Sequence, residues 1–370
     1  MPVREILILA GEESGDLHGA ALAEQLRRFS PGCALVGTGG DRMAAAGVTL
    51  LERTRGIVGF VEVIRHIPAH FTLQRRVRER MASGSVGLVI LIDYPGFNMR
   101  VAADAKAAGV PVLYYITPQV WAWRAGRLAT MARVISKAAV ILPFEEELLR
   151  KHGIDATFVG HPLLDRAREL PDRAEARRRI GVAAGGELLA LFPGSRQQEI
   201  ARHLEGFLSV ARLLQARRPG LSVVLSAAST VRLDAAQVGY PIVGAASFDV
   251  LRAANVALCK SGTTTLEAAV AGCPCVIAYR TSPLSYAIAK RLVRIPHIGL
   301  LNIIAGRRVA PEFVQREFEP VRVAAALEPL FVSGSAERVA MISALDEVRT
   351  KLGTSGASER VARMAMEMIA

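Results

Sequence analysis

Short apolar runs alternate with amphipathic segments along almost the whole chain, and this alternation limits the fold more than any other sequence feature. Runs such as Ile6–Ala10, Leu88–Ile92 and Val256–Cys259 have the length of strands and are apolar throughout, as expected of parallel strands that helices cover on both faces. The turns between runs and helices carry Gly, Ser, Asp and Pro, which are typical of strand-to-helix connections. We therefore predict a doubly wound α/β fold.

The alternation predicts strands in both halves of the chain. In the first half they are Ile6–Ala10, Ala34–Gly37, Leu88–Ile92, Val112–Ile116, Ala139–Pro143 and Thr157–Gly160. In the second half they are Glu187–Phe192, Ser222–Ser226, Pro241–Val243, Val256–Cys259 and Pro274–Ala278. Helices of the first half are expected to begin near Asp16, Asp41, Asn98, Ala125 and Phe144.

The alternation is interrupted by a highly charged segment, Leu164–Ile180, which has no strand pattern. We interpret it as a solvated helix that connects two domains, because 370 residues exceed the usual size of one domain. The predicted domains are 1–170 and 186–350, followed by a terminal helix over 355–370 that could pack back on the first domain. Two doubly wound domains are expected to face each other across a cleft, with ligands at the carboxyl ends of the strands.

The composition indicates a folded protein with an excess of positive charge. Hydrophobic residues make up 51% and charged residues 22%, which excludes a disordered chain. The net charge of +12 favours a polyanionic partner, although a biased genome composition explains it equally well. No apolar run approaches the roughly 20 residues that span a bilayer, and the N-terminus has no signal-peptide pattern. We expect a cytoplasmic or peripheral protein.

Polar residues that could take part in binding or catalysis follow three strands of the first half. Gly11–Gly15 permits close backbone approach, and Asp16 is expected to open a helix whose N-terminus attracts anions. Asp93 follows a fully apolar strand and is placed for a general base, although capping of the next helix explains it better from the residue pattern alone. Both tryptophans lie between Gln119 and Arg124, where they could line a sugar or acyl site or simply pack.

Two segments of the second half resemble phosphate-binding helix starts. Ser195 and Arg196 fall at a helix N-terminus, where free amides and a guanidinium suit a diphosphate. Ser261–Thr263 crowds a second helix N-terminus, and Glu267 lies about one turn later, where a carboxylate can accept from ribose hydroxyls. A capping box accounts for less of this pattern. The chain has no Asp-x-Asp pair for a nucleotide-bound metal, so helix termini and arginines are expected to neutralise the diphosphate.

Nine short segments, in their order and spacing, carry a family resemblance. They are Gly11–Asp16, Val58–Val63, Ile92–Asn98, Ile116–Arg124, Leu142–Glu145, Phe158–Pro162, Phe192–Arg196, Ser261–Glu267 and Asn302–Gly306. Together they resemble the lipid-A-disaccharide synthases. Glu13 and Thr264 stand where that family commonly has alanine, and neither departure changes the chemistry that the resemblance implies.

The resemblance implies an inverting glycosyltransferase of the GT-B arrangement, with two Rossmann-like domains and neither a metal nor another cofactor. The implied donor is UDP-2,3-diacylglucosamine and the implied acceptor is 2,3-diacylglucosamine 1-phosphate, giving the β-1,6-linked disaccharide 1-phosphate and UDP. Asp93 becomes the leading candidate for the base that deprotonates the acceptor 6-hydroxyl. The implied donor-binding residues are Ser195, Arg196, Ser261, Gly262, Thr263, Glu267 and Asn302. The acceptor-side candidates are Ser14, Gly15, Gln119 and Arg124.

A further segment suggests contact with a membrane surface. Ile57–Leu73 is unusually apolar and Arg75–Arg80 follows it directly, a combination that suits an anionic bilayer surface. A core-facing helix with a charged end is the alternative. Because both implied substrates are acylated, we favour docking on the cytoplasmic face of the inner membrane. The candidate docking residues are Phe60, Val61, Ile64, Phe71, Arg75, Arg76 and Arg78.

Other functions are open to the sequence alone. A peptidoglycan N-acetylglucosaminyltransferase or a UDP-sugar 2-epimerase would share Ser261–Glu267, but neither explains Ile92–Asn98 together with Pro118–Arg124. A lipid-binding or nucleic-acid-binding module would leave the two phosphate-type helix starts unexplained and would release no UDP. We expect no nucleic-acid partner, and the sequence leaves a homodimer open.

Overall fold

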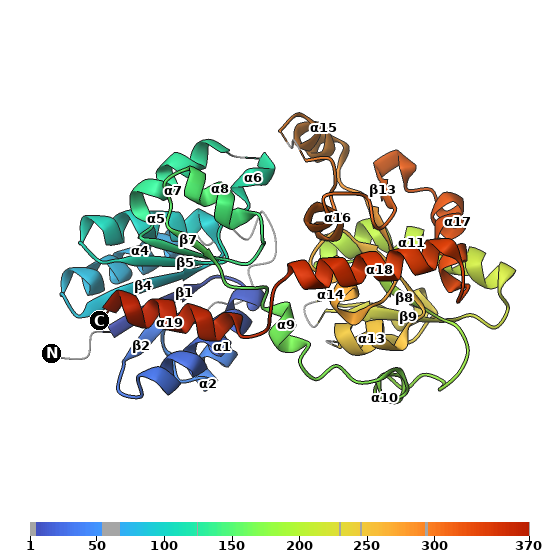
Figure 1. Ribbon diagram of the computed structural model, residues 1–370, viewed down its shortest axis with the longest axis horizontal. Coiled ribbons are helices and arrows are strands. Elements are labelled where there is room, and N and C mark those ends of the chain that lie inside the picture. Colours follow the sequence, from blue (N-terminus) through green and yellow to red (C-terminus); the bar gives the residue numbers. More distant parts are fainter. Residues whose placement is uncertain are drawn as a thin grey trace. The chain divides into compact units, whose positions relative to one another are not determined.

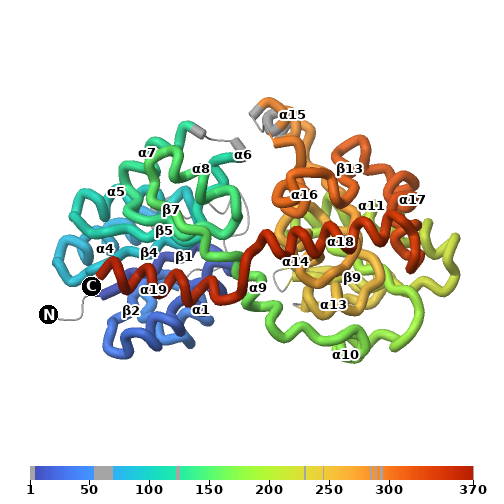
Figure 2. Tube along the Cα trace, viewed as in Figure 1, coloured from blue at the N-terminus to red at the C-terminus, as the bar shows by residue number. Residues whose placement is uncertain are grey.

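A computed structural model describes residues 5–53, 67–123, 125–228, 231–244, 246–292 and 295–369. Its contacts group the chain into two units (Figure 1). Unit 1 comprises residues 1–165 together with 353–370, and unit 2 comprises residues 166–352. The chain therefore returns to unit 1 at its C-terminus, where α19 (Ala357–Ile369) packs against α1 (Glu13–Phe29), as the red and blue segments in Figure 2 show.

Unit 1 is built on a seven-stranded parallel sheet with the order β3-β2-β1-β4-β5-β6-β7. Its strands are β1 (Glu5–Ala10), β2 (Leu35–Gly39), β3 (Thr49–Arg53), β4 (Val86–Ile92), β5 (Val112–Tyr115), β6 (Lys137–Val140) and β7 (Ala156–Phe158). Its other helices are α2 (Asp41–Ala45), α4 (Ile67–Ala82), α5 (Pro95–Ala107), α6 (Val120–Trp123), η1 (Ala125–Arg127), α7 (Leu128–Val134) and α8 (Glu145–Lys151). The short helix α9 (Leu163–Arg166) crosses the boundary between the units.

Alternation along the central strand β1 explains why helices cover both faces of this sheet. Leu7 and Leu9 point into one core, which α4, α5 and α7 complete, whereas Ile6 and Ile8 point into the other, which α1 and α19 complete. Side chains of successive strand residues face opposite sides of a sheet. Because both sets are apolar and fully buried, the strand needs a helical layer on each side.

Unit 2 is built on a six-stranded parallel sheet with the order β10-β9-β8-β11-β12-β13. Its strands are β8 (Leu188–Phe192), β9 (Ser222–Ala227), β10 (Ile242–Gly244), β11 (Val256–Lys260), β12 (Cys275–Tyr279) and β13 (Glu312–Val314). Its helices are α10 (Arg173–Arg179), α11 (Gln197–Arg217), α12 (Ala235–Val238), α13 (Ser247–Ala253), α14 (Thr264–Ala271), α15 (Pro283–Leu292), α16 (Leu300–Ala305), η2 (Gln315–Glu317), α17 (Pro320–Phe331) and α18 (Ala336–Lys351).

The two parallel sheets and their helical layers confirm the predicted doubly wound α/β fold class. The strands β3 and β13 were not among the predicted ones. Both lie at a sheet edge, and β3 is only partly buried, so neither has the continuous apolar run of a central strand. Among the described residues, no helix combines the length and apolar character that crossing a membrane requires.

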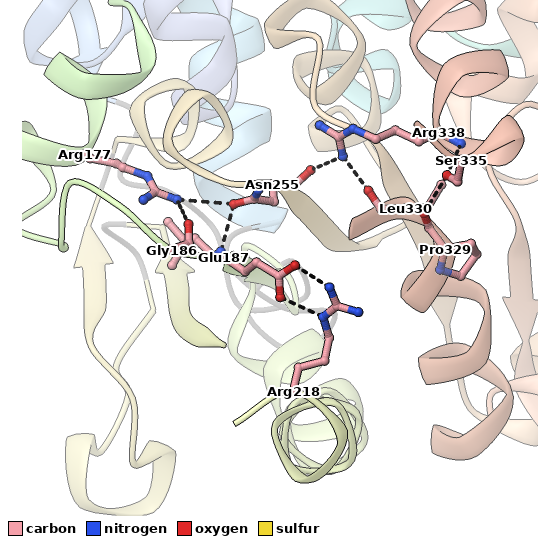
Figure 3. Close-up of polar contacts among 10 residues, drawn as sticks. Arg177, Gly186, Glu187, Arg218, Asn255, Pro329, Leu330, Ser335 and Arg338 are labelled. Atoms are coloured by element: carbon pink, nitrogen blue, oxygen red, sulfur yellow. Dashed lines mark hydrogen bonds and ion pairs between the residues drawn. The ribbon is translucent and has the colours of Figure 1, made fainter. Parts of the chain in front are cut away.

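The charged segment after Leu164 differs from its prediction as a solvated connection. Arg177 on α10 is only 2% exposed and donates a hydrogen bond to the carbonyl oxygen of Ala253. It also donates to the carbonyl oxygen of Gly186 and to Oδ1 of Asn255 (Figure 3). The same Oδ1 accepts from the Leu188 amide, at 2.9 Å, at the start of β8. A buried guanidinium is tolerated because its donors find acceptors, so α10 is fixed to unit 2.

Further contacts next to these hold one end of the unit 2 sheet. Arg338 on α18 donates to the carbonyl oxygens of Asn255, at 3.0 Å, and Leu330, and Arg218 pairs with Glu187 (Figure 3). Asn255 and Glu187 precede β11 and β8 directly, so this network holds the amino ends of the central strands. The carboxyl ends of these strands are left for the loops that carry the candidate site residues.

Candidate functional site

The strand order reverses once in each unit, and the predicted site residues follow the strands at that point. In unit 1 the reversal lies between β1 and β4, which lead into Gly11–Gly15 and Asp93. In unit 2 it lies between β8 and β11, which lead into Ser195–Arg196 and Ser261–Thr263. Doubly wound proteins bind ligands at such switch points, because the two connections leave toward opposite faces of the sheet. Each unit therefore brings its own candidates to the edge where a ligand is expected.

An ion pair that the sequence did not indicate joins the two loops of unit 2. Glu199 on the first turn of α11 accepts a hydrogen bond from the Ser195 amide through Oε2, at 3.0 Å. Its Oε1 lies 2.9 Å from Nζ of Lys260, the last residue of β11, and 3.8 Å from Nη1 of Arg196. The carboxylate thus occupies the α11 N-terminus, where a helix attracts negative charge.

The Glu199–Lys260 pair is largely enclosed, with side-chain exposures of 15% and 17%. Burial by itself would raise the pKa of Glu199, but the hydrogen bond and charge of Lys260 outweigh it and the pKa is lowered. Glu199 is therefore ionised at neutral pH. The Glu199 carboxylate is thus one anion that lies between two cations, Lys260 and Arg196.

Two glycines with unusual backbone angles lie beside this pair. Gly194 has φ 144, and a Cβ at this position would lie 2.6 Å from Cβ of Glu199. Gly262 has φ 154, and a Cβ there would lie 3.4 Å from Nζ of Lys260. Such backbone angles favour glycine, so the glycines of the Pro-Gly-Ser-Arg and Ser-Gly-Thr segments are required by the loops themselves.

The second helix start is shaped by Ser261 and Thr263. Ser261 Oγ donates to the carbonyl oxygen of Ile298, at 2.7 Å, so this hydroxyl ties its loop to the segment before α16. Thr263 is the N-cap residue of α14, is exposed, and makes no side-chain capping hydrogen bond. The capping explanation of this segment is therefore not met in the structure, and a ligand role for Thr263 stays a prediction.

Glu267, the predicted ribose ligand, lies in the first turn of α14 and is paired with an arginine. Nη1 of Arg166 lies 3.1 Å from Oε1 of Glu267, whose side chain is 10% exposed. The guanidinium carbon of Arg166 also lies 5.2 Å from the ring centroid of Phe248, a distance at which a cation and an aromatic face attract. Arg166 was missed because nothing in the charged segment distinguishes it from its arginine neighbours.

The surroundings of Asn302 differ from those that contact with a nucleotide requires. Its side chain is fully buried. Its Nδ2 donates to Ala310 O and Glu312 Oε1, both at 2.8 Å, and its Oδ1 accepts from the amides of Val309 and Ala310. All its hydrogen-bonding groups are thus used within unit 2. Direct contact with the nucleotide stays a prediction that this burial disfavours, and Asn302 stabilises the loop before β13.

In unit 1, Asp93 stands in an unusual backbone conformation. Asp93 and Tyr94 have φ values of 47 and 49, in the left-handed region that non-glycine residues seldom adopt. The Asp93 carbonyl accepts hydrogen bonds from Asn98 Nδ2 and Tyr114 OH, both at 2.7 Å. Such strain persists where surrounding contacts enforce it, commonly at functional sites. The N-cap residue of α5 is Tyr94 rather than Asp93.

The first loop of unit 1 packs directly against this turn. A Cβ on Gly11 would lie 2.2 Å from Cγ of Tyr94, so the aromatic ring covers the glycine and couples the loops after β1 and β4. Ser14 is exposed on the first turn of α1, and Gly15 is buried with Ala10 beside it. The two acceptor-side candidates therefore stand next to the Asp93 turn in the fold.

Asp16 was expected to open α1, and this expectation is wrong. The helix begins at Glu13, and Asp16 is buried within it. Its carboxylate accepts hydrogen bonds from the amides of Gly40 and Met43, at 2.6 and 3.0 Å, at the start of α2. Asp16 thus satisfies the free amides of the next helix, and its charge is not presented to a ligand.

Glu145 holds the tryptophan segment through a hydrogen bond. In the sequence, this residue was noted only as part of a family motif. Trp121 Nε1 donates to Glu145 Oε1, at 3.0 Å, and the Leu142 amide lies 3.2 Å from Oε2. Burial raises the pKa of Glu145 to about 7. The candidate Gln119 is exposed, two residues before Trp121, and Arg124 lies outside the described residues.

His161 is another titratable group of unit 1 with a large pKa shift. Burial, and secondly the charge of His18, lower its pKa to about 3. Its Nδ1 accepts from the Leu163 amide, at 3.1 Å. The imidazole is therefore neutral, and its enclosure makes it a less suitable base than the half-buried Asp93.

Comparison with solved structures defines the class of fold. Arabidopsis thaliana UGT89C1, solved with quercetin, superposes with a TM-score of 0.65 over 99% of this chain and 99% of its own, at 12% identity. The UDP-GlcNAc 2-epimerase of Methanocaldococcus jannaschii, solved with UDP-GlcNAc and UDP, gives 0.63 over 98% and 99%, at 10% identity. The chain thus has the glycosyltransferase GT-B type of fold, which these two proteins share despite different activities.

Sequence comparison then separates the family from its structural neighbours. The lipid-A-disaccharide synthetase family model matches residues 6–365. The lipid-A-disaccharide synthases of Geobacter metallireducens and Geobacter sulfurreducens are 42% and 41% identical to this chain, covering 100% and 98% of it and 98% and 97% of their own lengths. The chain belongs to the lipid-A-disaccharide synthase family and is a glycosyltransferase of lipid A biosynthesis, which confirms the resemblance seen in its motifs.

The buried Glu145 makes the stability of unit 1 depend on pH. Because its pKa is raised from 4.5 to about 7 in the fold, the folded state binds the proton more tightly than the unfolded state. Its contribution to the free energy of unfolding is therefore largest below pH 4.5 and falls as pH rises to 7, by on the order of 3 kcal/mol. Replacement of Glu145 with Gln should remove this slope in urea titrations followed by tryptophan fluorescence, because both tryptophans lie in unit 1.

The matched control is Glu147→Gln, on the same helix but at a fully exposed position. It should leave the slope between pH 5 and 7.5 unchanged. Equal pH slopes in the wild type and in Glu145→Gln, or an equal change of slope in both variants, would contradict the assigned pKa.

Proposed function

We propose that this protein joins two acylated sugars at its two switch points, unit 2 binding the UDP-linked donor and unit 1 the acceptor. The donor is UDP-2,3-diacylglucosamine and the acceptor is 2,3-diacylglucosamine 1-phosphate. Family membership supports the reaction, and the solved UDP complexes of the same fold support a uridine nucleotide as a ligand. The observation that carries the residue roles is that the family segments flank the strand reversal in both units.

Asp93 acts as the base in this proposal. Its carboxylate removes the proton from the acceptor 6-hydroxyl as that oxygen attacks the anomeric carbon of the donor. The bond between this carbon and the diphosphate oxygen breaks, the electron pair leaves with UDP, and the configuration inverts. The strained turn, held by Asn98 and Tyr114, fixes the backbone of Asp93 at the switch point before the acceptor arrives, which lowers the entropic cost of orientation.

The leaving diphosphate is stabilised by groups of unit 2 alone. Arg196, at the start of α11, and Lys260 lie 3.8 and 2.9 Å from the Glu199 carboxylate, which holds both cations in place. Fixed cations and amides that face a developing negative charge need no rearrangement during the reaction. We assign Lys260 to this group in addition to the residues expected from the sequence, and Glu267, paired with Arg166, to the ribose.

Docking on an anionic membrane surface completes the proposal. The helix α4 buries Leu73 and Val77 but leaves Phe71 57% exposed, with Arg75 and Arg76 also exposed. An exposed aromatic ring beside cations suits the bilayer interface. Arg78 contributes less, because it is paired with Asp104 at 2.7 Å. The predicted docking residues Phe60, Val61 and Ile64 lie outside the described residues.

Replacement of Asp93 with Asn should lower kcat by about 10²–10⁴-fold, the usual contribution of a general base. Asn tolerates the left-handed conformation as Asp does, so the turn should persist and UDP affinity should not change. Steady-state assays with both lipid substrates and calorimetry with UDP measure the two effects. Asp155→Asn, at an exposed position of unit 1, is the control and should keep wild-type turnover. Near-native turnover of Asp93→Asn would move the base elsewhere.

Replacement of Arg196 with Met should weaken UDP binding by about 10–150-fold, which corresponds to about 1.5–3 kcal/mol for a charge-assisted contact. Arg202 is exposed on the same helix, α11, and lies outside the proposed site. Its replacement with Met removes the same charge and should change UDP affinity less than twofold at physiological salt. Equal losses in the two variants would show that only the net charge matters and would refute the assigned site.

Replacement of Phe71 with Ser should reduce binding to anionic phospholipid vesicles in a flotation assay without changing UDP affinity. The residue is exposed, so stability should change little. Val339→Ser removes a side chain of similar exposure, 58%, from α18 of unit 2 and should bind vesicles as the wild type does. Undiminished vesicle binding of Phe71→Ser, or unfolding of this variant, would show that α4 does not dock through this face.

A further inference from the structure

Unit 2 contains a large open cavity at the carboxyl edge of its sheet, separate from the residues assigned above. Its volume is about 1320 Å³, above the range of about 300–1,000 Å³ that is usual for sites of drug-sized ligands. The apolar part of its wall comes from the ends of β12 and β13, from α15 and from the segment before α16 (Figure 1), namely Tyr279, Tyr286, Ile295, Ile298 and Val314.

Hydrogen bonds connect the cavity wall to the Ser261–Thr263 loop and to the start of α11, the two segments proposed to bind the diphosphate. The Ile298 carbonyl accepts the hydrogen bond from Ser261 Oγ at 2.7 Å. On the other side, the Arg280 amide lies 2.9 Å from His203 Nε2, and His203 Nδ1 lies 2.7 Å from the carbonyl oxygen of Glu199. Because the Ser261 loop is one hydrogen bond from a lining residue, and Glu199 at the start of α11 is two hydrogen bonds away through His203, the cavity adjoins the proposed position of the donor diphosphate.

Positive charge gathers around this cavity. Arg280, Lys290, Arg308 and Arg316 line it, against two carboxylates, Glu312 and Glu317. The Glu312 carboxylate is turned into the protein, where it accepts from the amides of Ile298 and Gly299 and from Asn302. The lining therefore combines apolar side chains with a surplus of exposed cations, which is the chemistry of a site for an anionic, acylated molecule.

We propose that this cavity binds acyl chains of the UDP-linked donor sugar. The inference rests on the proposed function and extends it, because it assigns the acylated part of the donor to unit 2. A donor that places its diphosphate beside Arg196 and Lys260 carries its fatty acyl groups on the adjoining sugar. An apolar wall beside these segments withdraws methylene groups from water. The surrounding cations favour the anionic donor over a neutral lipid.

The chain-length dependence of binding tests this proposal. Each methylene withdrawn from water increases affinity by roughly fourfold. We therefore expect UDP-diacylglucosamines with acyl chains of four, six and eight carbons to bind the wild type in steps that together exceed tenfold in calorimetry. Ile295→Asp should flatten this series to less than threefold while UDP itself binds as before. The matched control is Ile342→Asp, on α18 outside the cavity and 40% exposed, which should keep the full series.

Each other outcome contradicts the assignment in a distinct way. A flat series in the wild type would mean that the donor chains stay outside the protein, and an undiminished series in Ile295→Asp would move them to another site. If dihexanoyl phosphatidylglycerol bound the cavity as tightly as the six-carbon donor, the occupant would be bilayer lipid. A wild type that shows the series but releases no UDP with both lipid substrates would refute the proposed function and not the cavity assignment.

Discussion

Burial of both faces of each parallel sheet is the constraint on which the rest of the structure depends. Strands such as β1 and β4 are apolar on both sides, so helices must cover two faces, and the chain has to reverse its strand order once to build both layers. That reversal leaves two neighbouring strands whose connections diverge at their carboxyl ends. In both units loops with unusual backbone angles lie at this point, Asp93–Tyr94 in unit 1 and those of Gly194 and Gly262 in unit 2.

The two switch points are prepared in different physical ways. Unit 1 stores backbone strain at Asp93, which hydrogen bonds to its carbonyl oxygen offset. Unit 2 instead places an enclosed ion pair, Glu199–Lys260, between two glycine-containing loops. In the proposed function, the group that accepts a proton is thus held by strain, whereas the region that receives a diphosphate is held by fixed charge. Both arrangements are complete before any ligand binds, as preorganised stabilisation requires.

Much of the fold and part of the site could be predicted from the sequence. Continuous apolar runs predict the central strands, and glycine, serine and aspartate after such runs predict the loops. The edge strands β3 and β13 lack that run, and Arg177 looks like its exposed neighbours because only packing shows that its donors meet carbonyl oxygens. Lys260, Glu199 and Arg166 were missed for the same reason, since their partners are distant in sequence. Asp16 was misassigned because the amides that it caps belong to another helix.

Transfer between the two lipid substrates is the central claim, and one measurement tests it directly. Purified protein is incubated with UDP-2,3-diacylglucosamine and 2,3-diacylglucosamine 1-phosphate, UDP release is followed, and the product linkage is determined by NMR. The account predicts that UDP appears only when both lipids are present and that the product is the β-1,6-linked disaccharide 1-phosphate. Release of UDP without the acceptor, or recovery of a UDP-sugar inverted at C2, would contradict it.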